Sequence, residues 1–235
     1  MKIIGISGKK QSGKNTVANF INGKILKENL LIENFNIDEQ GLLQVQTANA
    51  AGKIGWGILD VTRKDPEFVS YARENIWPLV KVYHFADYLK KICIDLFGLT
   101  EEQVYGTDAQ KNTMTPYNNM SARDFMQYLG TDVMRSIKNS VWVDYTLKLV
   151  QQEQSDLAII PDVRFPDEVR AIENAGGIVI RLTRDVESSK HFCELALDYD
   201  KFNWDSFAAI INNSDCSVKE LCTQIEYTDI IWSNI

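Results

Sequence analysis

A glycine-rich string stands near the N-terminus, between a short apolar run and an amphipathic stretch. Residues 2–6 read KIIGI, residues 8–16 read GKKQSGKNT, and apolar side chains then recur at helical spacing. This order predicts a strand, a tight loop and a helix. Glycines let successive N–H groups converge on phosphate oxygens, the helix N-terminus adds the positive end of its dipole, and Lys14 can span two phosphates. The string therefore predicts a polyphosphate site on an α/β fold.

The string has the GxxxxGK spacing of a Walker A loop, with one departure. The strict pattern has Ser or Thr directly after the lysine, whereas Asn15 stands there and Thr16 follows. The spacing GK-x-T is typical of nucleoside monophosphate kinases, and no NKxD string supports a GTPase. The alternatives are a glycine turn that merely joins strand to helix and, for Lys10, a solvated surface lysine. The predicted nucleotide-binding residues are Gly8, Lys10, Ser12, Gly13, Lys14, Asn15 and Thr16, with Thr16 also a candidate magnesium ligand.

A second polar group follows the apolar run LAIIP at residues 157–161. Asp162 and Arg164 stand just after this predicted strand. Because parallel strands end at one edge of a sheet, both residues are expected beside the phosphate loop. An acid there can order magnesium-bound water, and an arginine can hold an acceptor phosphate through two hydrogen bonds. A helix cap for Asp162 and a surface ion pair for Arg164 are the alternatives.

Apolar runs alternate with amphipathic stretches along the chain. Further strands are expected at 80–85, 178–182 and 208–211, with helices after 87, from 122, at 142–150, before 176 and from 218. This alternation is typical of a mostly parallel sheet covered on both faces. For 235 residues we expect one domain, 1–235, with an insertion at about 33–81. In the insertion a hairpin turns near 40–41, after which three glycines break any period; residues 106–120 are expected to form a loop.

Composition excludes several classes of protein. The chain has 25 Lys plus Arg against 32 Asp plus Glu, a net charge of −7, which disfavours a general nucleic-acid binder. No apolar run approaches the roughly 18 residues of a membrane span. Four cysteines without a CxxC pair make a zinc site or a disulfide framework improbable, and Cys93 and Cys222 fall on apolar helical stripes as small buried hydrophobes.

Further strings, in order along the chain, resemble the bacteriophage deoxynucleoside monophosphate kinases, which are P-loop nucleotide kinases. HFADYLKKICIDLFGL at 84–99 is similar to the family's FADPLK…LFGL segment, with Tyr88 in place of proline. ARDFMQYLGTDVMR at 122–135 resembles R-x-x-x-Q-x-LGT-x-x-x-R, and IIPDVRFPDEVRAIENAGGIVIRLTR at 159–184 resembles DVRFPNE…GG…IR…R. His191 with Glu194, then Asn212 with Asn213, resemble two later signals. The likeness runs from residue 2 to about 225 and is weak only in the insertion.

The resemblance implies a three-layer P-loop kinase fold, with ATP and magnesium used to convert a deoxynucleoside monophosphate (dNMP) to the diphosphate. The residues it implies for phosphoryl transfer are Lys14, Arg164 and Arg184, and those it implies for the dNMP are Asp87, Arg123, Gln127 and Arg135. Beside these we expect Asp162 to be catalytic, Asp162 and Thr16 to be magnesium ligands, and Lys90, Asp132 and Arg164 to contact the dNMP. Such kinases often dimerise, so a homodimer is one expected arrangement. We expect a cytoplasmic protein, in the host cytoplasm if the source is a phage, with no nucleic-acid or membrane partner.

Two other functions stay open at this point. One is another small-acceptor P-loop kinase, such as one that acts on dephospho-coenzyme A. The other is a non-catalytic ATP-binding regulatory protein, which the departure at Asn15 keeps open. The residues alone also allow plainer roles: a helix cap for Asp87, a solvated glutamine for Gln127 and a surface arginine for Arg184.

Overall fold

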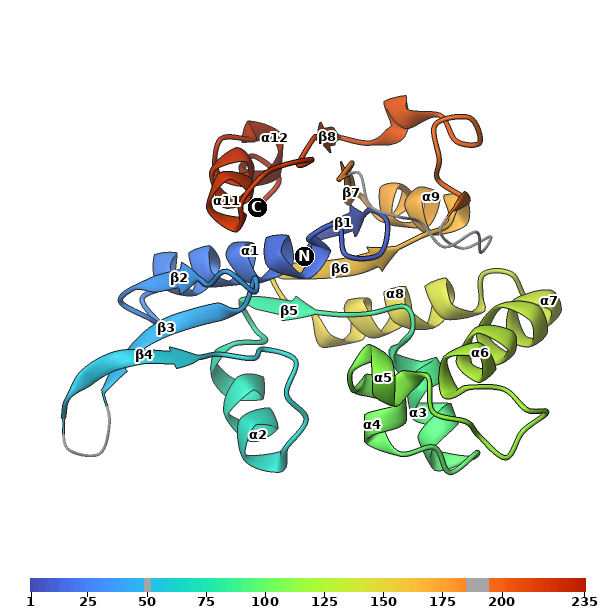
Figure 1. The fold of residues 1–235 in the computed structure, drawn as a ribbon. Coiled ribbons are helices and arrows are strands. Elements are labelled where there is room, and N and C mark those ends of the chain that lie inside the picture. Colours follow the sequence, from blue (N-terminus) through green and yellow to red (C-terminus); the bar gives the residue numbers. More distant parts are fainter. Residues whose placement is uncertain (49–51, 185–194) are drawn as a thin grey trace. The chain divides into compact units, whose positions relative to one another are not determined.

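A computed structural model describes residues 1–48, 52–184 and 195–235, and the predicted His191 and Glu194 lie outside them. The chain divides into two compact units, and Figure 1 labels the helices and strands of both. Unit 1 comprises Met1–Tyr83 and Val150–Ile235, and unit 2 comprises His84–Leu149. That the chain forms a single domain stays a prediction, and the expected insertion at 33–81 lies within unit 1.

Unit 1 is built on a five-stranded parallel sheet in the order β5-β6-β1-β7-β8. Its strands are β1 (Lys2–Ser7), β5 (Val80–Val82), β6 (Leu157–Val163), β7 (Ile178–Leu182) and β8 (Ala209–Ile211). All five were expected from apolar runs, because a parallel strand buried on both faces has few polar positions. The mostly parallel α/β fold is therefore confirmed.

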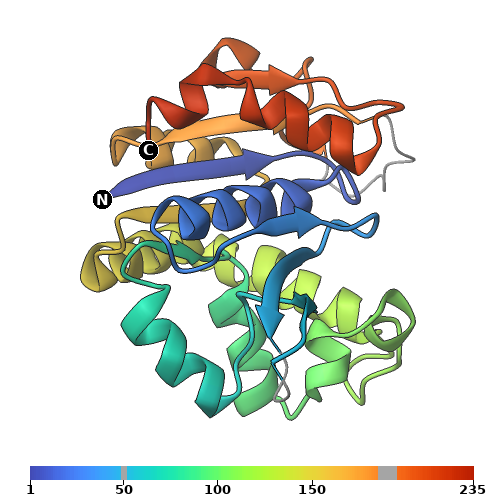
Figure 2. The same ribbon diagram turned by 90° about the vertical axis from the view of Figure 1, so that its left-hand side faces the viewer.

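Helices cover both faces of this sheet. The long helix α1 (Lys14–Glu28) and α11 (Val218–Glu226) lie in front of the sheet in Figure 2, and α9 (Pro166–Asn174) lies behind it. The short helices are α12 (Asp229–Trp232) and the 3₁₀ turn η2 (Trp204–Ser206). Side chains of α1 such as Val17 and Ile21 pack with Ile4 and Ile159 of the sheet in one buried apolar cluster. This packing fixes the start of α1 against the end of β1.

The expected insertion forms a small antiparallel sheet and a helix. Its strands are β2 (Phe35–Ile37), β3 (Leu43–Ala48) and β4 (Ile54–Ile58), in that order, and α2 (Pro66–Asn75) follows. The predicted hairpin is confirmed, with its turn at Gly41. Gly55 and Gly57, which break the period of the sequence, lie inside β4, a strand that was not predicted. Pairing with β3 stabilises this strand and outweighs the low strand propensity of glycine.

All the regular secondary-structure elements described in unit 2 are helices. It holds α3 (Asp87–Asp95), α4 (Glu101–Tyr105), α5 (Asp108–Lys111), α6 (Ala122–Gln127), the π-helical segment η1 (Tyr128–Met134), α7 (Arg135–Ile137) and most of α8 (Val141–Glu153). Ser121 caps the expected helix, since its hydroxyl accepts from the N–H of Asp124. The loop expected at 106–120 instead contains α5, which Thr107 and Gln110 stabilise through a capping box.

The predictions for Cys93 and Cys222 are confirmed. Trp142, at the start of α8, is buried, and its indole N–H donates to the carbonyl of Gly130 at 2.9 Å. Cys93 is fully buried, and burial raises the pKa of its thiol to about 11. Burial has the same effect on Cys222, which packs against the core of unit 1. Among the helices of the described residues, none combines the length and the apolar character that a membrane span needs.

Candidate active site

The loop between β1 and α1 ends at a helix N-terminus with no side-chain cap. Gly13, just before α1, adopts a left-handed φ of 93°, which glycine accepts without strain. The first turn of α1 carries no acidic residue. The first backbone hydrogen bond of the helix runs from Val17 N to Gly13 O at 3.0 Å. The N–H groups ahead of Val17 therefore have no intrahelical acceptor, which is the arrangement that binds an anion.

The rest of the loop folds tightly over buried polar atoms. A Cβ on Gly8 would lie 2.3 Å from Ser12 Oγ, so only glycine fits there. Ser12 is buried, its N–H donates to Lys9 O at 3.2 Å, and its hydroxyl has no hydrogen-bond partner among the described atoms. A cradle of backbone with an unsatisfied hydroxyl is consistent with a bound oxyanion.

Lys14 curls back over this loop. Its Nζ donates to Gly8 O at 2.8 Å and to Lys9 O at 2.6 Å. These bonds hold the half-buried ammonium group at the loop itself. A phosphate bound by the loop would therefore meet a positioned cation, which is the role predicted for Lys14.

Asn15 and Thr16 face different surroundings. Asn15 is exposed, whereas Thr16 lies under the β2–β3 turn: a Cβ on Gly41 would stand 2.2 Å from Thr16 Oγ1. Gly41 has a left-handed φ of 80°, and its carbonyl accepts from Asn19 Nδ2 at 2.8 Å. The turn thus packs on the first turns of α1, and the Thr16 hydroxyl points at the turn.

Asp162 lies inside β6, which corrects the expected end of that strand at residue 161. The strand continues to Val163, and the register with β1 shifts, so that Gly5 pairs with Ile160 but Ser7 pairs with Val163. The irregularity falls at Pro161, which has no N–H to give to the ladder. Asp162 and Arg164 are both half-buried at the strand end that adjoins the phosphate loop. The parallel sheet therefore places these two residues beside the phosphate loop, as predicted.

The turn that carries Arg164 is held by a buried carboxylate. Glu168 on α9 accepts from the N–H of Arg164 at 2.6 Å and from that of Phe165 at 3.0 Å. These bonds fix the backbone at Arg164, so the position from which its side chain extends is rigid.

Arg184, expected as a cation near the transferred phosphate, is bound to the loop after β8. Its Nε donates to Asn213 O at 3.3 Å and its Nη2 to Cys216 O at 2.9 Å. Asn213 is fully buried and donates from Nδ2 to Ser12 O at 2.8 Å. Arg184 and Asn213 together tie the loop after β8 to the phosphate loop.

Replacing Asn213 tests this tie. Asn213→Ala is expected to lower the free energy of unfolding by about 1–3 kcal/mol, because the buried Ser12 carbonyl loses its donor. The thermal shift that ATP produces should also shrink, because the phosphate loop is less fixed. Urea unfolding and a thermal-shift titration measure the two effects. The matched control is Asn212→Ala, at the exposed neighbouring position. Equal losses in both variants would show that the buried bond has no special weight.

Arg181 belongs to the same region, and sequence reasoning missed it. It is buried on β7, donates from Nη1 to Ser7 Oγ at 2.8 Å and lies 3.8 Å from Asp198 Oδ1. Asp198 is also 3.7 Å from Lys9 Nζ in the phosphate loop. The sequence does hold a signal that could have identified Arg181. It is an arginine inside the apolar strand IVIRL, and a buried charge requires partners.

In unit 2, Asp87 and Lys90 both lie in the first turn of α3. Asp87 Oδ2 accepts from His84 N at 3.1 Å, and Lys90 Nζ lies 4.8 Å from the centre of the Tyr105 ring. Burial, with the nearby Asp87 charge as a smaller cause, raises the pKa of Tyr105 to about 12. Tyr105 is therefore near both the Lys90 ammonium group and the Asp87 charge.

The other predicted substrate residues of unit 2 lie on the helix that runs from α6 through η1 to α7. Arg123 binds Asp108 Oδ1 at 2.5 Å and Asn112 Oδ1 at 3.1 Å, both from the α5 region. Gln127 is half-buried, Arg135 is buried, and Asp132 is exposed. The π-helical segment η1 separates Gln127 from Arg135 and shifts the phase of the helix between them; such segments are frequent at functional sites.

Comparison with known proteins agrees with this geometry. A family model described as deoxynucleotide monophosphate kinase matches residues 2–225. The deoxynucleotide monophosphate kinase of Enterobacteria phage T4 is 28% identical over 256 aligned positions, which cover 97% of this chain and 98% of that protein. A putative deoxynucleotide monophosphate kinase of Acanthamoeba polyphaga mimivirus is 35% identical over 113 residues, 43% of this chain and 58% of its own length. With a phosphate loop on a parallel sheet and a match over nearly its whole length, the chain belongs to the deoxynucleotide monophosphate kinase family.

Proposed function

We propose that this protein transfers the γ-phosphoryl group of ATP to a deoxynucleoside monophosphate, forming the diphosphate and ADP. The observation that carries the proposal is the family match over residues 2–225, joined to the open N-terminus of α1 at the phosphate loop. Phosphoryl transfer needs positioning and positive charge more than covalent chemistry. We divide the residues into a donor set, which binds ATP, and an acceptor set, which binds the dNMP.

The donor set lies in unit 1. Backbone N–H groups at the start of α1 bind phosphate oxygens, and Lys14 moves its ammonium group from Gly8 O and Lys9 O to the β- and γ-phosphates. Asn213 and Arg184 hold the loop after β8 against the phosphate loop and so keep it in shape. Arg184 reaches the phosphates only if it leaves its two carbonyl acceptors, so we assign it first to this structural tie.

The acceptor set begins with Arg164, whose planar guanidinium fits a phosphate through two hydrogen bonds. We assign the dNMP phosphate to Arg164 at the end of β6. The residues of unit 2 assigned to the rest of the dNMP are Asp87, Lys90, Arg123, Gln127, Asp132 and Arg135. Gln127 offers both a donor and an acceptor, as reading a base edge requires, and Arg123 is positioned by Asp108.

The metal fits this site through few protein ligands. Kinase magnesium usually takes one or two carboxylates together with substrate phosphates and water. Asp162 offers one such carboxylate, half-buried at the strand end that adjoins the phosphate loop. Bound magnesium would neutralise charge on the phosphate oxygens. We assign it to Asp162; the Thr16 hydroxyl, which points at Gly41, is a weaker candidate.

A coupled ADP-release assay tests the proposal. The full chain is given ATP and magnesium with each of the four dNMPs, the four ribonucleotides or dephospho-coenzyme A. We expect turnover with at least one dNMP. Turnover with dephospho-coenzyme A alone would assign the chain to another acceptor class, and ATP binding without any turnover would favour a regulatory protein.

A further inference from the structure

The phosphate loop carries a lysine side chain, Lys9, to which the proposed function gives no role. Its backbone is fixed within the loop, because the Lys9 carbonyl accepts from Ser12 N at 3.2 Å and from Lys14 Nζ at 2.6 Å. Its side chain is partly exposed, and its Nζ lies 3.7 Å from Asp198 Oδ1. The ammonium group of Lys9 is therefore at the phosphate loop but faces a carboxylate from another part of unit 1.

That carboxylate is held in place by its own backbone and by a second cation. The carbonyl of Asp198 accepts from Lys201 N at 2.9 Å and from Phe202 N at 3.0 Å, so the chain turns tightly at this residue. Arg181 Nη2 lies 3.8 Å from Asp198 Oδ1, the same oxygen that Lys9 approaches. One carboxylate oxygen is thus shared by two cations.

Arg181 is the less mobile of the two cations. Its buried side chain donates from Nη1 to Ser7 Oγ at 2.8 Å. Its guanidinium carbon lies 5.5 Å from the centre of the Trp204 ring and 5.9 Å from that of Phe207, within the range of cation–π attraction. A buried charge needs a compensating partner, so Asp198 is required at Arg181 whether or not Lys9 is present.

The contact between Lys9 and Asp198 is loose by comparison. A charge-assisted N–H···O bond measures about 2.7–2.9 Å, shorter than the 3.7 Å found here. Lysine carries a compact charge on a flexible four-carbon stem, and partly exposed ion pairs of this kind stabilise a protein little. Separating Lys9 from Asp198 therefore costs little, and an anion of higher charge at the loop competes well for the ammonium group.

We propose that Lys9 is a further ATP-binding residue, whose ammonium group moves from Asp198 to the phosphates when ATP binds. Asp198 then stays with Arg181. In the chain without nucleotide, Asp198 competes with ATP for Lys9 and so weakens ATP binding. The inference rests on the ATP binding of the proposed function but not on transfer to a dNMP, so binding alone tests it.

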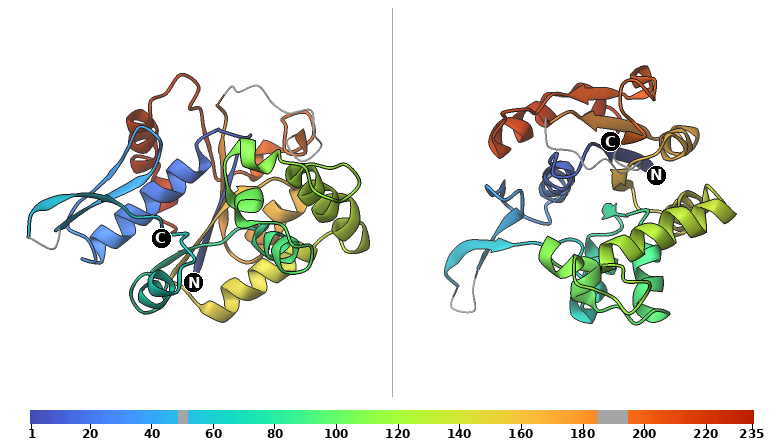
Figure 3. Two further views of the ribbon diagram at one scale, coloured as in Figure 1. Left: turned by 60° about the horizontal axis from the view of Figure 1, so that its bottom comes forward. Right: turned by 45° about the vertical axis from the view of Figure 1, so that its right-hand side comes forward.

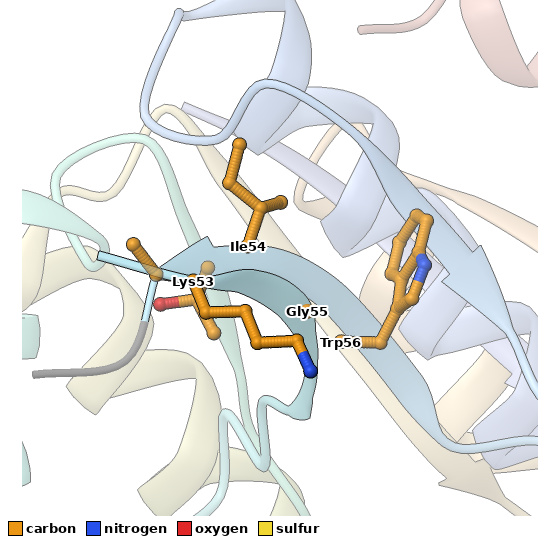
Figure 4. Close-up of a pocket in the computed structure, with 6 residues that line it drawn as sticks. Lys53, Ile54, Gly55 and Trp56 are labelled. Atoms are coloured by element: carbon orange, nitrogen blue, oxygen red, sulfur yellow. The ribbon is translucent and has the colours of Figure 1, made fainter. Parts of the chain in front are cut away.

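The first test is Lys9→Met, with isothermal titration calorimetry of magnesium-ATP into the full chain and no acceptor present. Loss of one charged hydrogen-bond donor should raise the Kd at least about 10-fold. The matched control is Lys53→Met. Lys53 is exposed at a pocket on the β3–β4 hairpin (Figure 4), which projects from unit 1 away from the start of α1 (Figure 3). This control should keep the wild-type Kd.

The second test is Asp198→Asn, which keeps the shape of the side chain but removes its charge. We expect the Kd for magnesium-ATP to fall about 3-fold, because Lys9 no longer leaves an ion pair to reach the phosphates. In a chain that also carries Lys9→Met, the same change should have a smaller effect. The matched control is Glu226→Gln, which removes the acid of another lysine pair, 3.1 Å from Lys24 Nζ, and should leave the Kd unchanged.

The outcomes separate this inference from the proposed function. A wild-type chain that binds no ATP would overturn both. If the wild type binds ATP but Lys9→Met binds it equally well, only the role of Lys9 is refuted. Tightening by Asp198→Asn to the same extent with and without Lys9 would likewise refute the competition, because Asp198 would then act on the phosphates directly.

Discussion

Lys14→Met is expected to lower kcat for dNMP phosphorylation on the order of 10²- to 10³-fold, the loss seen when one positioned donor to a developing charge is removed. Methionine keeps the unbranched stem but has no ammonium group for the phosphates. In the present structure that group is held at the loop by Gly8 O and Lys9 O, so the wild-type chain has it in place before ATP arrives. Initial rates of ADP release at saturating substrates measure the effect.

The control for Lys14→Met is Lys27→Met at the other end of the same helix. Lys27 is exposed, and its Nζ lies 3.4 Å from Asn34 Oδ1 at the surface. Its variant should keep the wild-type rate, which separates loss of a phosphate cation from loss of a lysine on α1. Thermal unfolding of both variants should resemble that of the wild type. A Lys14→Met enzyme within a few fold of the wild-type rate would refute the role assigned to this loop.

The core of unit 1 could be predicted because its signals are local. The run KIIGI, the glycines of the phosphate loop and the apolar face of α1 each indicate their own conformation, and their order implies the parallel sheet. The strand β4 could not, because its conformation depends on pairing with β3 while Gly55 and Gly57 lower its own propensity. Short α5 is stabilised by Thr107 and Gln110, a capping signal easily missed in a polar stretch.

Candidate site residues such as Lys14 and Arg164 were named from the sequence, but Arg181 and the partners of the named residues were not. Arg181 contacts Ser7 and Asp198, which are distant in sequence, so only the folded sheet identifies the group. The direction of the Thr16 hydroxyl is likewise decided by Gly41, which belongs to a hairpin with no visible link to the loop. Spacing identifies a phosphate loop; tertiary contacts decide which of its side chains are available to the nucleotide.

Arg164→Ala is expected to lower kcat/KM for the dNMP on the order of 10²- to 10³-fold and to leave the thermal shift caused by ATP nearly unchanged. Arg164 stands at the end of β6, where Glu168 fixes its backbone N–H, so the guanidinium is presented from a rigid turn. Removing a charge-assisted contact to phosphate has effects of this size. Arg164→Lys should recover part of the loss, because it restores the charge but not the planar, two-bond geometry.

The comparison that decides the role of Arg164 is with Arg170→Ala on α9. Arg170 is exposed on the helix that follows, so its loss should leave kcat/KM unchanged. A kinase requires Arg164 for the acceptor and Lys14 for the donor, so the two variants should fail in different steps: Arg164→Ala still responds to ATP, while Lys14→Met loses that response as well as turnover. A regulatory ATP-binding protein would need Lys14 to bind ATP but would not need Arg164. If Arg164→Ala behaves like Arg170→Ala in every assay, the acceptor site is not at the end of β6.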